Sequence, residues 1–438
     1  MRDAAAPNTT ERRRELTDLT GTQVSPETAE SGIDSYSRWR RYRDALVPPL
    51  VALLGAWAVI AWRSPYRGWS LLAPSSYNRW DTGQYLGIAR TGYNAAWHCP
   101  ARSLPRDLPP GNYLCGKIGW FPGYPYTMRA LSTVTGIPLE TAGLVLAWAS
   151  WYLVLVLMWR LLADARSTTT RWICLLIAAF FPGQIYFAAI FPISMCIAGI
   201  LGCLYFALLT SRPVFAWAGF AVGFVAAYSY ITAIVLAPTL LIVGLLVVRG
   251  RRRYQFIIPA AGAAAGFGAV LLTMQVAVGI WNAYFISAKK FNVGAHSPLD
   301  TLTNRLRPLW TSQPSPVLNY KAAQTLLTLC FVGLVCLVTI VGAVRGRDAP
   351  EVRQQDWSTA ITSRISAFDL TFVLMAIGVW LVPYIAGGTA STYRSEAFVI
   401  VCVPLLRRLP VWLLVVPLGA AVWVAWNMAP YFFNGQLQ

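Results

Sequence analysis

The segment from Tyr77 to Tyr93, YNRWDTGQYLGIARTGY, holds the residues best suited to chemistry. Its one carboxylate, Asp81, comes shortly after an apolar stretch, and a carboxylate near a membrane boundary is costly unless it is paired or used. Such a group can take the proton of an alcohol, and a general base of this kind contributes about 10² to 10⁴ in rate. Asp81 is therefore the candidate general base. The alternative is that Asp81 only caps the helix that follows it.

The residues around Asp81 have helical or near-helical spacing. Trp80, Tyr85, Ile88 and Tyr93 recur in a pattern that predicts a short amphipathic helix along a membrane interface, with Asp81 at its start. The candidate substrate contacts in this segment are Arg79, Trp80, Gln84, Tyr85 and Tyr93.

Basic side chains elsewhere could bind a phosphate, because a guanidinium contacts phosphate oxygens in bidentate fashion. Arg394 lies between two apolar stretches, and its alternative is a structural ion pair with Glu396. Lys289 and Lys290 could instead be interfacial charges beside lipid headgroups. His296 lies in the same polar segment, with an ordinary loop residue as the alternative. The external basic candidates are Arg79, Lys289, Lys290, Arg305, Arg307 and Arg394.

The composition places these residues in a membrane protein. Of 438 residues, 56% are hydrophobic and 12% are charged, whereas soluble domains carry about 25% charged residues. A water-soluble protein is excluded. The net charge of +18 comes mainly from basic residues between apolar stretches, which is typical of positive-inside topology. We expect membrane lipids as partners and no nucleic acid.

Apolar stretches of about 20 residues predict an all-α polytopic bundle of about eleven transmembrane helices over residues 46–428. Basic loops place the N-terminus in the cytosol, with segments 63–138 and 281–321 outside. Residues 1–45 are expected to be a disordered cytosolic segment, and 429–438 a C-terminal tail. The predicted helices are 46–62, 141–162, 172–190, 193–210, 214–230, 231–248, 255–280, 322–344, 367–386, 395–406 and 410–428.

Cys99 and Cys115 bracket a Pro- and Gly-rich stretch of the first external segment. A disulfide is expected if that segment faces an oxidising compartment; the alternative is two unpaired thiols. External acids are few and show no metal-ligand spacing, whereas a hard cation wants several oxygen ligands. We therefore predict no metal ion or other cofactor.

The pattern W-D-x-x-x-Y-x-x-I-A-x-x-G-Y over residues 80–93 resembles the signature of PIG-V-type mannosyltransferases and their bacterial relatives. These enzymes belong to the GT-C superfamily of polyprenyl-phosphate-sugar-dependent glycosyltransferases. Two later stretches support the resemblance. WFPGYP at 120–125 is similar to the family's F-F-P-x-x-P, and FPGQIYF at 181–187 is similar to its F-P-G-S-x-x-F.

The resemblance implies a GT-C-type bundle whose long first extracytoplasmic loop carries interfacial helices. It implies an inverting transfer of a sugar, most often mannose, from a polyprenyl-phosphate donor, with Asp81 as general base. The acceptor would be an extracytoplasmic glycolipid or cell-wall glycan. An Arg-rich, Lys-poor composition favours the plasma membrane of a bacterium, such as an actinobacterium.

The chain also departs from the family pattern. Phe191, Pro192 and Ile193 stand where the family usually has Tyr-Ser-Glu, and Ser229, Tyr230 and Thr232 fall where it has an R-P-x-G motif. These changes motivate a second hypothesis. In that reading the chain is a non-catalytic polyprenyl-phosphate-binding protein or carrier on the same scaffold.

Overall fold

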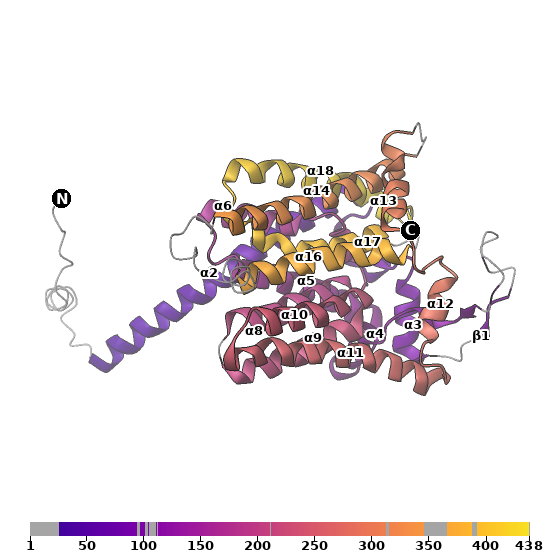
Figure 1. The fold of residues 1–438 in the computed structure, drawn as a ribbon, viewed down its shortest axis with the longest axis horizontal. Helices are drawn as coiled ribbons and strands as arrows, with labels where there is room; N and C mark the ends of the chain where they lie inside the picture. Colours follow the sequence, from indigo (N-terminus) through magenta and orange to yellow (C-terminus); the bar gives the residue numbers. More distant parts are fainter. Residues whose placement is uncertain are drawn as a thin grey trace. The chain divides into compact units, whose positions relative to one another are not determined.

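The computed structural model describes residues 26–93, 97–100, 104, 111, 113–210, 212–311, 315–345, 366–387 and 392–437. Helices dominate this part of the chain, as the all-α prediction requires (Figure 1). The boundary between two compact units falls after Pro48. The fold and the sites below belong to the second unit, Pro49–Gln438.

Six helices are long and apolar enough to cross a membrane, judged by length and composition. They are α2 (Pro26–Arg63), α5 (Leu139–Leu161), α11 (Tyr254–Val278), α14 (Pro316–Arg345), α16 (Ala367–Ala386) and α18 (Val411–Phe433). Shorter apolar helices are α6 (Thr168–Ala179), α8 (Ile193–Leu209), α9 (Pro213–Ser229) and α10 (Leu236–Leu246), which extends the 3₁₀ helix η5 (Ile231–Val235). The membrane-protein prediction holds, but the count of eleven full spans is not reproduced.

Two predicted spans take another form. In the stretch 172–190, α6 ends at Ala179 and the short helix α7 (Ile185–Ala188) follows. The stretch 395–406 becomes the end of α17 (Thr392–Glu396) and a 3₁₀ helix, η10 (Ala397–Arg408), in which every residue up to Arg407 is buried. This stretch is apolar because it lies in the protein core, which hydropathy alone does not distinguish from lipid contact.

The segments predicted to be external carry short elements. The first holds η1 (Gly68–Leu72), η2 (Pro74–Tyr77), α3 (Thr82–Thr91), η4 (Lys117–Gly119), α4 (Gly123–Thr135) and an antiparallel pair of strands, β1 (Trp97–His98) and β2 (Leu114–Cys115). The second holds α12 (Ala283–Lys289), α13 (Pro298–Leu306) and η7 (Arg307–Leu309). Figure 1 shows α3, α12, α13 and α17 gathered at one end of the long helices.

Both chain ends differ from their predicted boundaries. Helix α2 begins at Pro26, so it occupies part of the predicted disordered segment 1–45; residues 1–25 lie outside the described ranges. A helix propagates cheaply once an adjoining turn has formed, and the apolar part of α2 supplies that turn. At the other end, α18 continues to Phe433, and Leu437 is buried.

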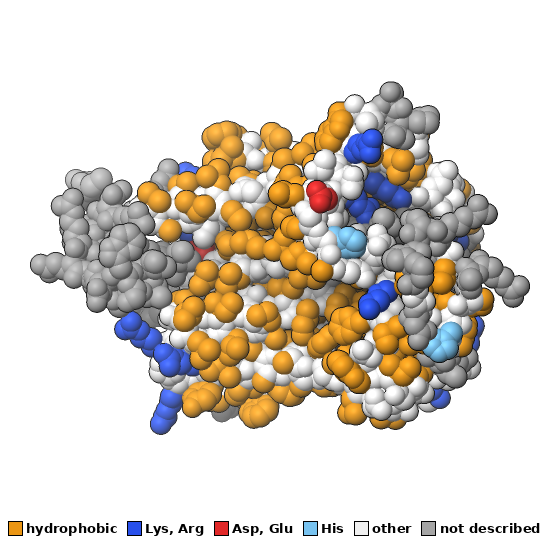
Figure 2. All heavy atoms as spheres, turned by 45° about the vertical axis from the view of Figure 1, so that its right-hand side comes forward, with side chains coloured by type: hydrophobic (Ala, Val, Ile, Leu, Met, Phe, Trp, Pro, Cys, Tyr) orange, Lys and Arg blue, Asp and Glu red, His pale blue; other side chains and the backbone are white. Residues whose placement is uncertain are grey.

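The opposite end of the bundle is basic. There the Arg166 amide donates to the Arg407 carbonyl, and Arg252 donates to the Leu208 carbonyl. The 3₁₀ helix η6 (Gly250–Arg253) adds three exposed arginines. Figure 2 shows apolar side chains over the sides of the helices and basic ones toward the ends, which is the distribution expected of a bilayer-spanning body.

Candidate active site

Asp81 is placed by an unusual turn at the start of α3. Trp80, just before it, has a left-handed backbone with φ of +44°, a conformation uncommon outside glycine. Asp81 occupies the N-cap position, but its carboxylate accepts no hydrogen bond from the first turn. The capping alternative is therefore wrong for the side chain. The carboxylate, 30% exposed, is left for another partner.

That partner is Arg394 on α17, 313 residues away in sequence. Its Nη1 donates to Oδ2 of Asp81, and the arginine side chain is only 6% exposed. The predicted alternative, a pair between Arg394 and Glu396, is wrong, since Glu396 binds other groups. No described residue bonds to Oδ1 of Asp81 in addition.

Aromatic rings surround the Arg394 guanidinium on three sides. Its carbon lies 5.6 Å from the centroid of Trp80, 5.5 Å from that of Tyr186 and 5.4 Å from that of Phe191. Burial alone would lower the pKa of Arg394, but the nearby Tyr186 and the Asp81 carboxylate raise it above the ordinary value. Arg394 therefore stays charged. Its Nε is buried and has no hydrogen-bond partner among the described residues, so the site keeps a donor for a ligand oxygen.

The other two family-like stretches pack closely on neighbouring elements. Gly183 of FPGQIYF has φ of +88°, and a Cβ there would lie 2.9 Å from Cβ of Ala397, next to α17. Gly123 of WFPGYP allows a similarly close approach to Ser229, where a Cβ would lie 2.5 Å from the hydroxyl. Each glycine therefore permits backbone contact between a motif and the elements beside Asp81 and Arg394.

Glu396 anchors α17 in the core. It is 1% exposed, and it accepts hydrogen bonds from the Thr325 hydroxyl at 2.6 Å, the Tyr384 hydroxyl at 2.7 Å and the Gln324 amide at 2.9 Å. Burial raises the pKa of Glu396 above the ordinary carboxyl value, although these donors pull it down. The three donors tie α17 to α14 and α16, and so fix the helix that carries Arg394.

Two further cations lie within electrostatic range of this site. Lys321, in the first turns of α14, lies within electrostatic range of Arg305 and Arg394. Its ammonium lies 4.7 Å from the ring centroid of Tyr393. Burial lowers the pKa of Arg305, on α13, while the nearby Glu396 acts in the opposite direction. Arg305, Lys321 and Arg394 together form a cation cluster, and Arg394 is its member that contacts Asp81.

Sequence reasoning named Arg305 only as one of several external cations and missed Lys321. A signal was present, because the chain has only four lysines, Lys117, Lys289, Lys290 and Lys321, and all four fall in the segments predicted to be external. Lys321 sits at the last position of the second such segment, and a boundary lysine is easily taken for a lipid-headgroup contact.

Comparison with known proteins gives limited information. No protein-family model matches the chain, and no curated protein matches it. Similar solved structures include the oligosaccharyltransferase AglB from Archaeoglobus fulgidus with an inhibitory peptide and a dolichol-phosphate, at TM-score 0.47, and an oligosaccharyltransferase of the same organism in the apo form, at 0.48. Each shares 13% identity and covers 90% of this chain, which spans 56% of the neighbour. Both scores are low, so neither structure transfers an activity or a site residue to this chain.

The other candidates on the first external segment have different surroundings. Arg79 donates to the Tyr66 hydroxyl at 2.7 Å and to the Phe433 carbonyl at 3.3 Å, so it links this segment to the end of α18. Gln84 is half-buried on α3. Tyr85 is buried within electrostatic range of Asp81. The Tyr93 hydroxyl donates to the Trp120 carbonyl at 2.6 Å.

The candidates on the second external segment lie around other elements. Lys289 is exposed at the end of α12, and the Lys290 ammonium lies 6.0 Å from the ring centroid of Trp120. His296 donates its backbone N–H to the Ile385 carbonyl of α16 at 2.8 Å. No described contact joins these three side chains to the pair of Asp81 and Arg394.

Two further predictions concern covalent and metal chemistry. Cys99 and Cys115 are joined by a disulfide, which closes the stretch next to the paired strands. Among the described residues, no group of three His, Cys, Asp or Glu side chains could hold a metal ion.

Proposed function

We propose that this chain is a membrane glycosyltransferase of the GT-C type that moves mannose from a polyprenyl-phosphate donor to an extracytoplasmic glycolipid or cell-wall glycan. The observation that carries the proposal is the partly exposed Asp81 carboxylate beside the buried, charged Arg394. The resemblance of residues 80–93, 120–125 and 181–187 to the PIG-V-type enzymes supports it, since the first stretch contains Asp81 and Tyr186 of the third lies beside Arg394.

In this proposal Asp81 is the general base. Oδ2 is held by Arg394, so Oδ1 accepts the proton of the acceptor hydroxyl. The hydroxyl oxygen forms a bond to the anomeric carbon of the donor sugar while the bond from that carbon to the phosphate oxygen breaks. A single displacement of this kind inverts the anomeric configuration.

The cation cluster stabilises the leaving group. The phosphate departs with the electron pair of the broken bond, so negative charge develops on its oxygens. Fixed cations aimed at developing charge are an effective form of catalysis. Arg394 has an unpartnered Nε for this purpose, with Arg305 and Lys321 in electrostatic range. We infer that these side chains, rather than a metal ion or other cofactor, hold the phosphate.

The two ends of the bundle support an orientation. The basic end, with Arg252 and Arg407, would face the cytosol according to the positive-inside rule. The end that carries Asp81 would then face the outside. The disulfide between Cys99 and Cys115 agrees with an oxidising compartment on that side. We place the protein in a bacterial plasma membrane with a cytosolic N-terminus.

The test is transfer from labelled polyprenyl-phosphomannose to a glycolipid fraction by the purified full chain. We expect turnover that survives EDTA and that falls by about 10² to 10⁴ in Asp81→Asn. The matched control is Asp300→Asn, which removes an exposed acid at the start of α13 and should change the rate by less than about twofold.

A second candidate is lipid binding without turnover. Two observations favour it: Arg394 already occupies one oxygen of Asp81, and the buried Ile193 stands where the family has a carboxylate. It predicts retention of polyprenyl phosphate with no transfer to any hydroxyl acceptor. Slow transfer that depends on Asp81 would eliminate it, and a rate unchanged in Asp81→Asn would refute the assignment of the base.

A further inference from the structure

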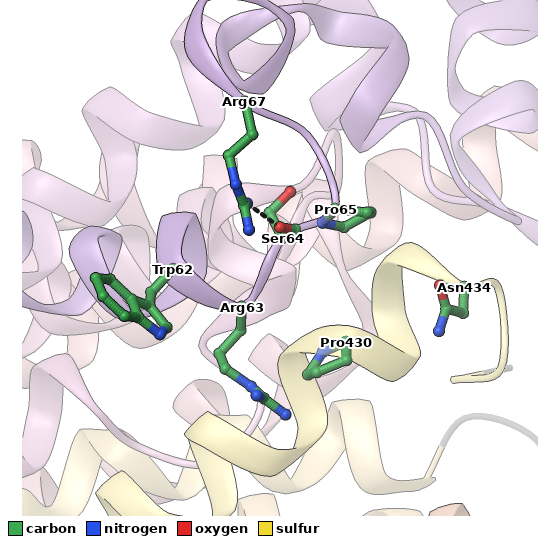
Figure 3. Close-up of a pocket in the computed structure, with 7 residues that line it drawn as sticks. All are labelled: Trp62, Arg63, Ser64, Pro65, Arg67, Pro430 and Asn434. Carbon is green, nitrogen blue, oxygen red and sulfur yellow. Dashed lines mark hydrogen bonds between the residues drawn. The ribbon is translucent and has the colours of Figure 1, made fainter.

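A recess of about 300 Å³ lies between the end of α2 and the end of α18 (Figure 3). Figure 3 shows Arg67 reaching toward Ser64 while Arg63 extends along α18 toward Pro430. The lining contains two cations, one amide and no acid. The residues that line it are Trp62, Arg63, Ser64, Pro65, Arg67, Pro430 and Asn434.

Arg63 is fixed by a proline in the facing helix. Pro430 has no backbone N–H, so it leaves the carbonyl four residues earlier, that of Trp426, without its helical donor. Nε of Arg63 donates to that carbonyl at 3.1 Å, and its guanidinium lies 5.1 Å from the centroid of the Trp426 ring. The guanidinium is therefore held through Nε, which leaves its two terminal nitrogens for another acceptor.

Arg67 is fixed by the end of α2. Its Nη1 donates to the carbonyl of Ala61, in the last turn of α2, and to the carbonyls of Ser64 and Tyr66, which follow the helix. A guanidinium has five N–H donors in a fixed plane, so Nη2 and Nε remain. In the described part of the chain, no carboxylate pairs with Arg63 or Arg67.

The surroundings of the recess match a membrane interface. Trp62 and Trp69 are 73% and 87% exposed, and exposed tryptophans at the ends of membrane helices sit at headgroup level. The sides of the two helices below are apolar and exposed, at Leu54 on α2 and at Val416 and Trp423 on α18. A bound molecule with one anionic group and two acyl chains would contact both regions.

We propose that this recess is a binding site for the phosphate of an anionic phospholipid, with Arg63 and Arg67 as the phosphate ligands and the acyl chains along α2 and α18. Two guanidiniums held in place by backbone carbonyls have lost their freedom before the lipid arrives, which lowers the cost of binding. The site is separate from Asp81 and does not depend on the proposed enzymatic function.

The test is native mass spectrometry of the purified, delipidated full chain titrated with phosphatidylglycerol or phosphatidylcholine. We expect one phosphatidylglycerol molecule to bind with an affinity that falls about tenfold or more in Arg63→Gln/Arg67→Gln, since both guanidiniums would lose charge-assisted hydrogen bonds to the phosphate. The control is Arg251→Gln/Arg253→Gln, which removes the same charge; like Arg63, Arg253 donates Nε to a backbone carbonyl, that of Val248. The control should retain the lipid.

Arg67→Ala keeps the experiment informative if the double variant folds poorly, because Arg67 is exposed; it should weaken binding about threefold or more while the melting temperature changes little. Equal binding by the wild type and Arg67→Ala would overturn the proposal, and so would an equal loss in the control. Equal affinity for phosphatidylcholine would overturn the anionic selectivity. Displacement of the lipid by millimolar inorganic phosphate would show a free-phosphate site instead.

Discussion

Two ends of the same bundle each hold an Asp–Arg pair, and the pairs differ in which hydrogen-bonding atoms remain without a described partner. At the basic end, Oδ1 of Asp369 lies 3.2 Å from Arg407 and Oδ2 lies 3.0 Å from Arg408. Both carboxylate oxygens are used, and Asp369 is only 9% exposed. At the other end, Asp81 uses one oxygen, is 30% exposed and faces an arginine whose Nε has no described partner.

Under the proposed function, the difference separates a structural pair from a reactive one. A buried pair with every acceptor satisfied fixes the chain and has nothing to offer a substrate. A pair in which the aspartate keeps an acceptor oxygen and the arginine keeps an N–H donor can bind a hydroxyl and an anion together. The comparison therefore makes opposite predictions for variants at the two ends.

The largest effect on stability is expected at Asp369. Asp369→Asn leaves Arg407, whose side chain is 8% exposed, without its counter-ion, and breaking a buried pair costs about 3–5 kcal/mol. We expect a clear drop in melting temperature in detergent, with unchanged turnover per folded molecule. Arg408→Gln is the milder control, because Arg408 is 51% exposed. A melting temperature equal to that of the wild type would show that this pair does not hold the fold.

The largest effect on activity after Asp81 itself is expected at Arg394. Arg394→Gln removes the charge that faces both Asp81 and the departing phosphate, and losing one member of a buried charged pair costs about 2–5 kcal/mol. We expect kcat/KM to fall about 10²-fold, and Arg394→Lys to recover only part of it because an ammonium lacks the planar fork. Initial rates over a donor titration measure this. A Gln variant within about threefold of the wild type would place the phosphate elsewhere.

A smaller effect, of about tenfold in kcat, is expected at Glu396. Glu396→Gln keeps the shape of the side chain but replaces one of its two acceptor oxygens with an N–H₂ group. That group cannot accept the hydrogen bonds that Thr325, Gln324 and Tyr384 donate to Glu396. The variant would misplace Arg394, so kcat should fall and the donor KM should rise less than it does in Arg394→Gln. Glu396→Asp, which keeps the charge, should recover part of the rate; no recovery, or loss confined to KM, would contradict a positioning role.

The pH profile gives an independent readout of Glu396. Its pKa is raised above the ordinary carboxyl value by burial. Glu396 therefore takes up a proton at a higher pH than a solvated glutamate, whose pKa is about 4.3. Protonation removes an acceptor from the donors that hold α17. We therefore expect activity to be present above the raised pKa and to fall as the pH drops through it. In Glu396→Gln the acid limb of the rate profile should move to lower pH; an unmoved limb would assign that limb to another group.

The smallest effect is expected at Lys321. Lys321→Gln removes one cation from the cluster but leaves Arg305 and Arg394, so a loss of about 1 kcal/mol is expected. This corresponds to about a fivefold rise in the donor KM, and Lys321→Arg should restore it. A matched change at Lys289, which is exposed on α12, should have less effect. If Lys289→Gln raises the KM more than Lys321→Gln does, the phosphate lies near α12 instead.

The sequence predicts local structure around the candidate site well. The helix after Asp81 follows from spacing, and the disulfide between Cys99 and Cys115 follows from their positions around one loop. It does not predict which distant groups meet. Arg394 is 313 residues from Asp81, and the donors to Glu396 come from α14 and α16. The spacing of residues in the sequence does not predict such contacts, because they arise from how the helices pack.

The sequence also misjudges the number of spans for a physical reason. Residues 397–406 are all apolar, yet they are buried in a 3₁₀ helix of the core. Apolar composition reports removal from water and does not say whether protein or lipid replaces it. The helix from Pro26 escaped prediction for a related reason, since polar residues there extend a helix that the apolar part of α2 stabilises.

The most direct measurement is single-turnover transfer by Asp81→Asn at saturating labelled donor, together with the donor Kd of the same variant. The account predicts that the transfer rate falls about 10²-fold or more. It also predicts that donor binding does not weaken, because Arg394 is freed from its carboxylate partner. A transfer rate within about twofold of the wild type would contradict the role of Asp81 as the base.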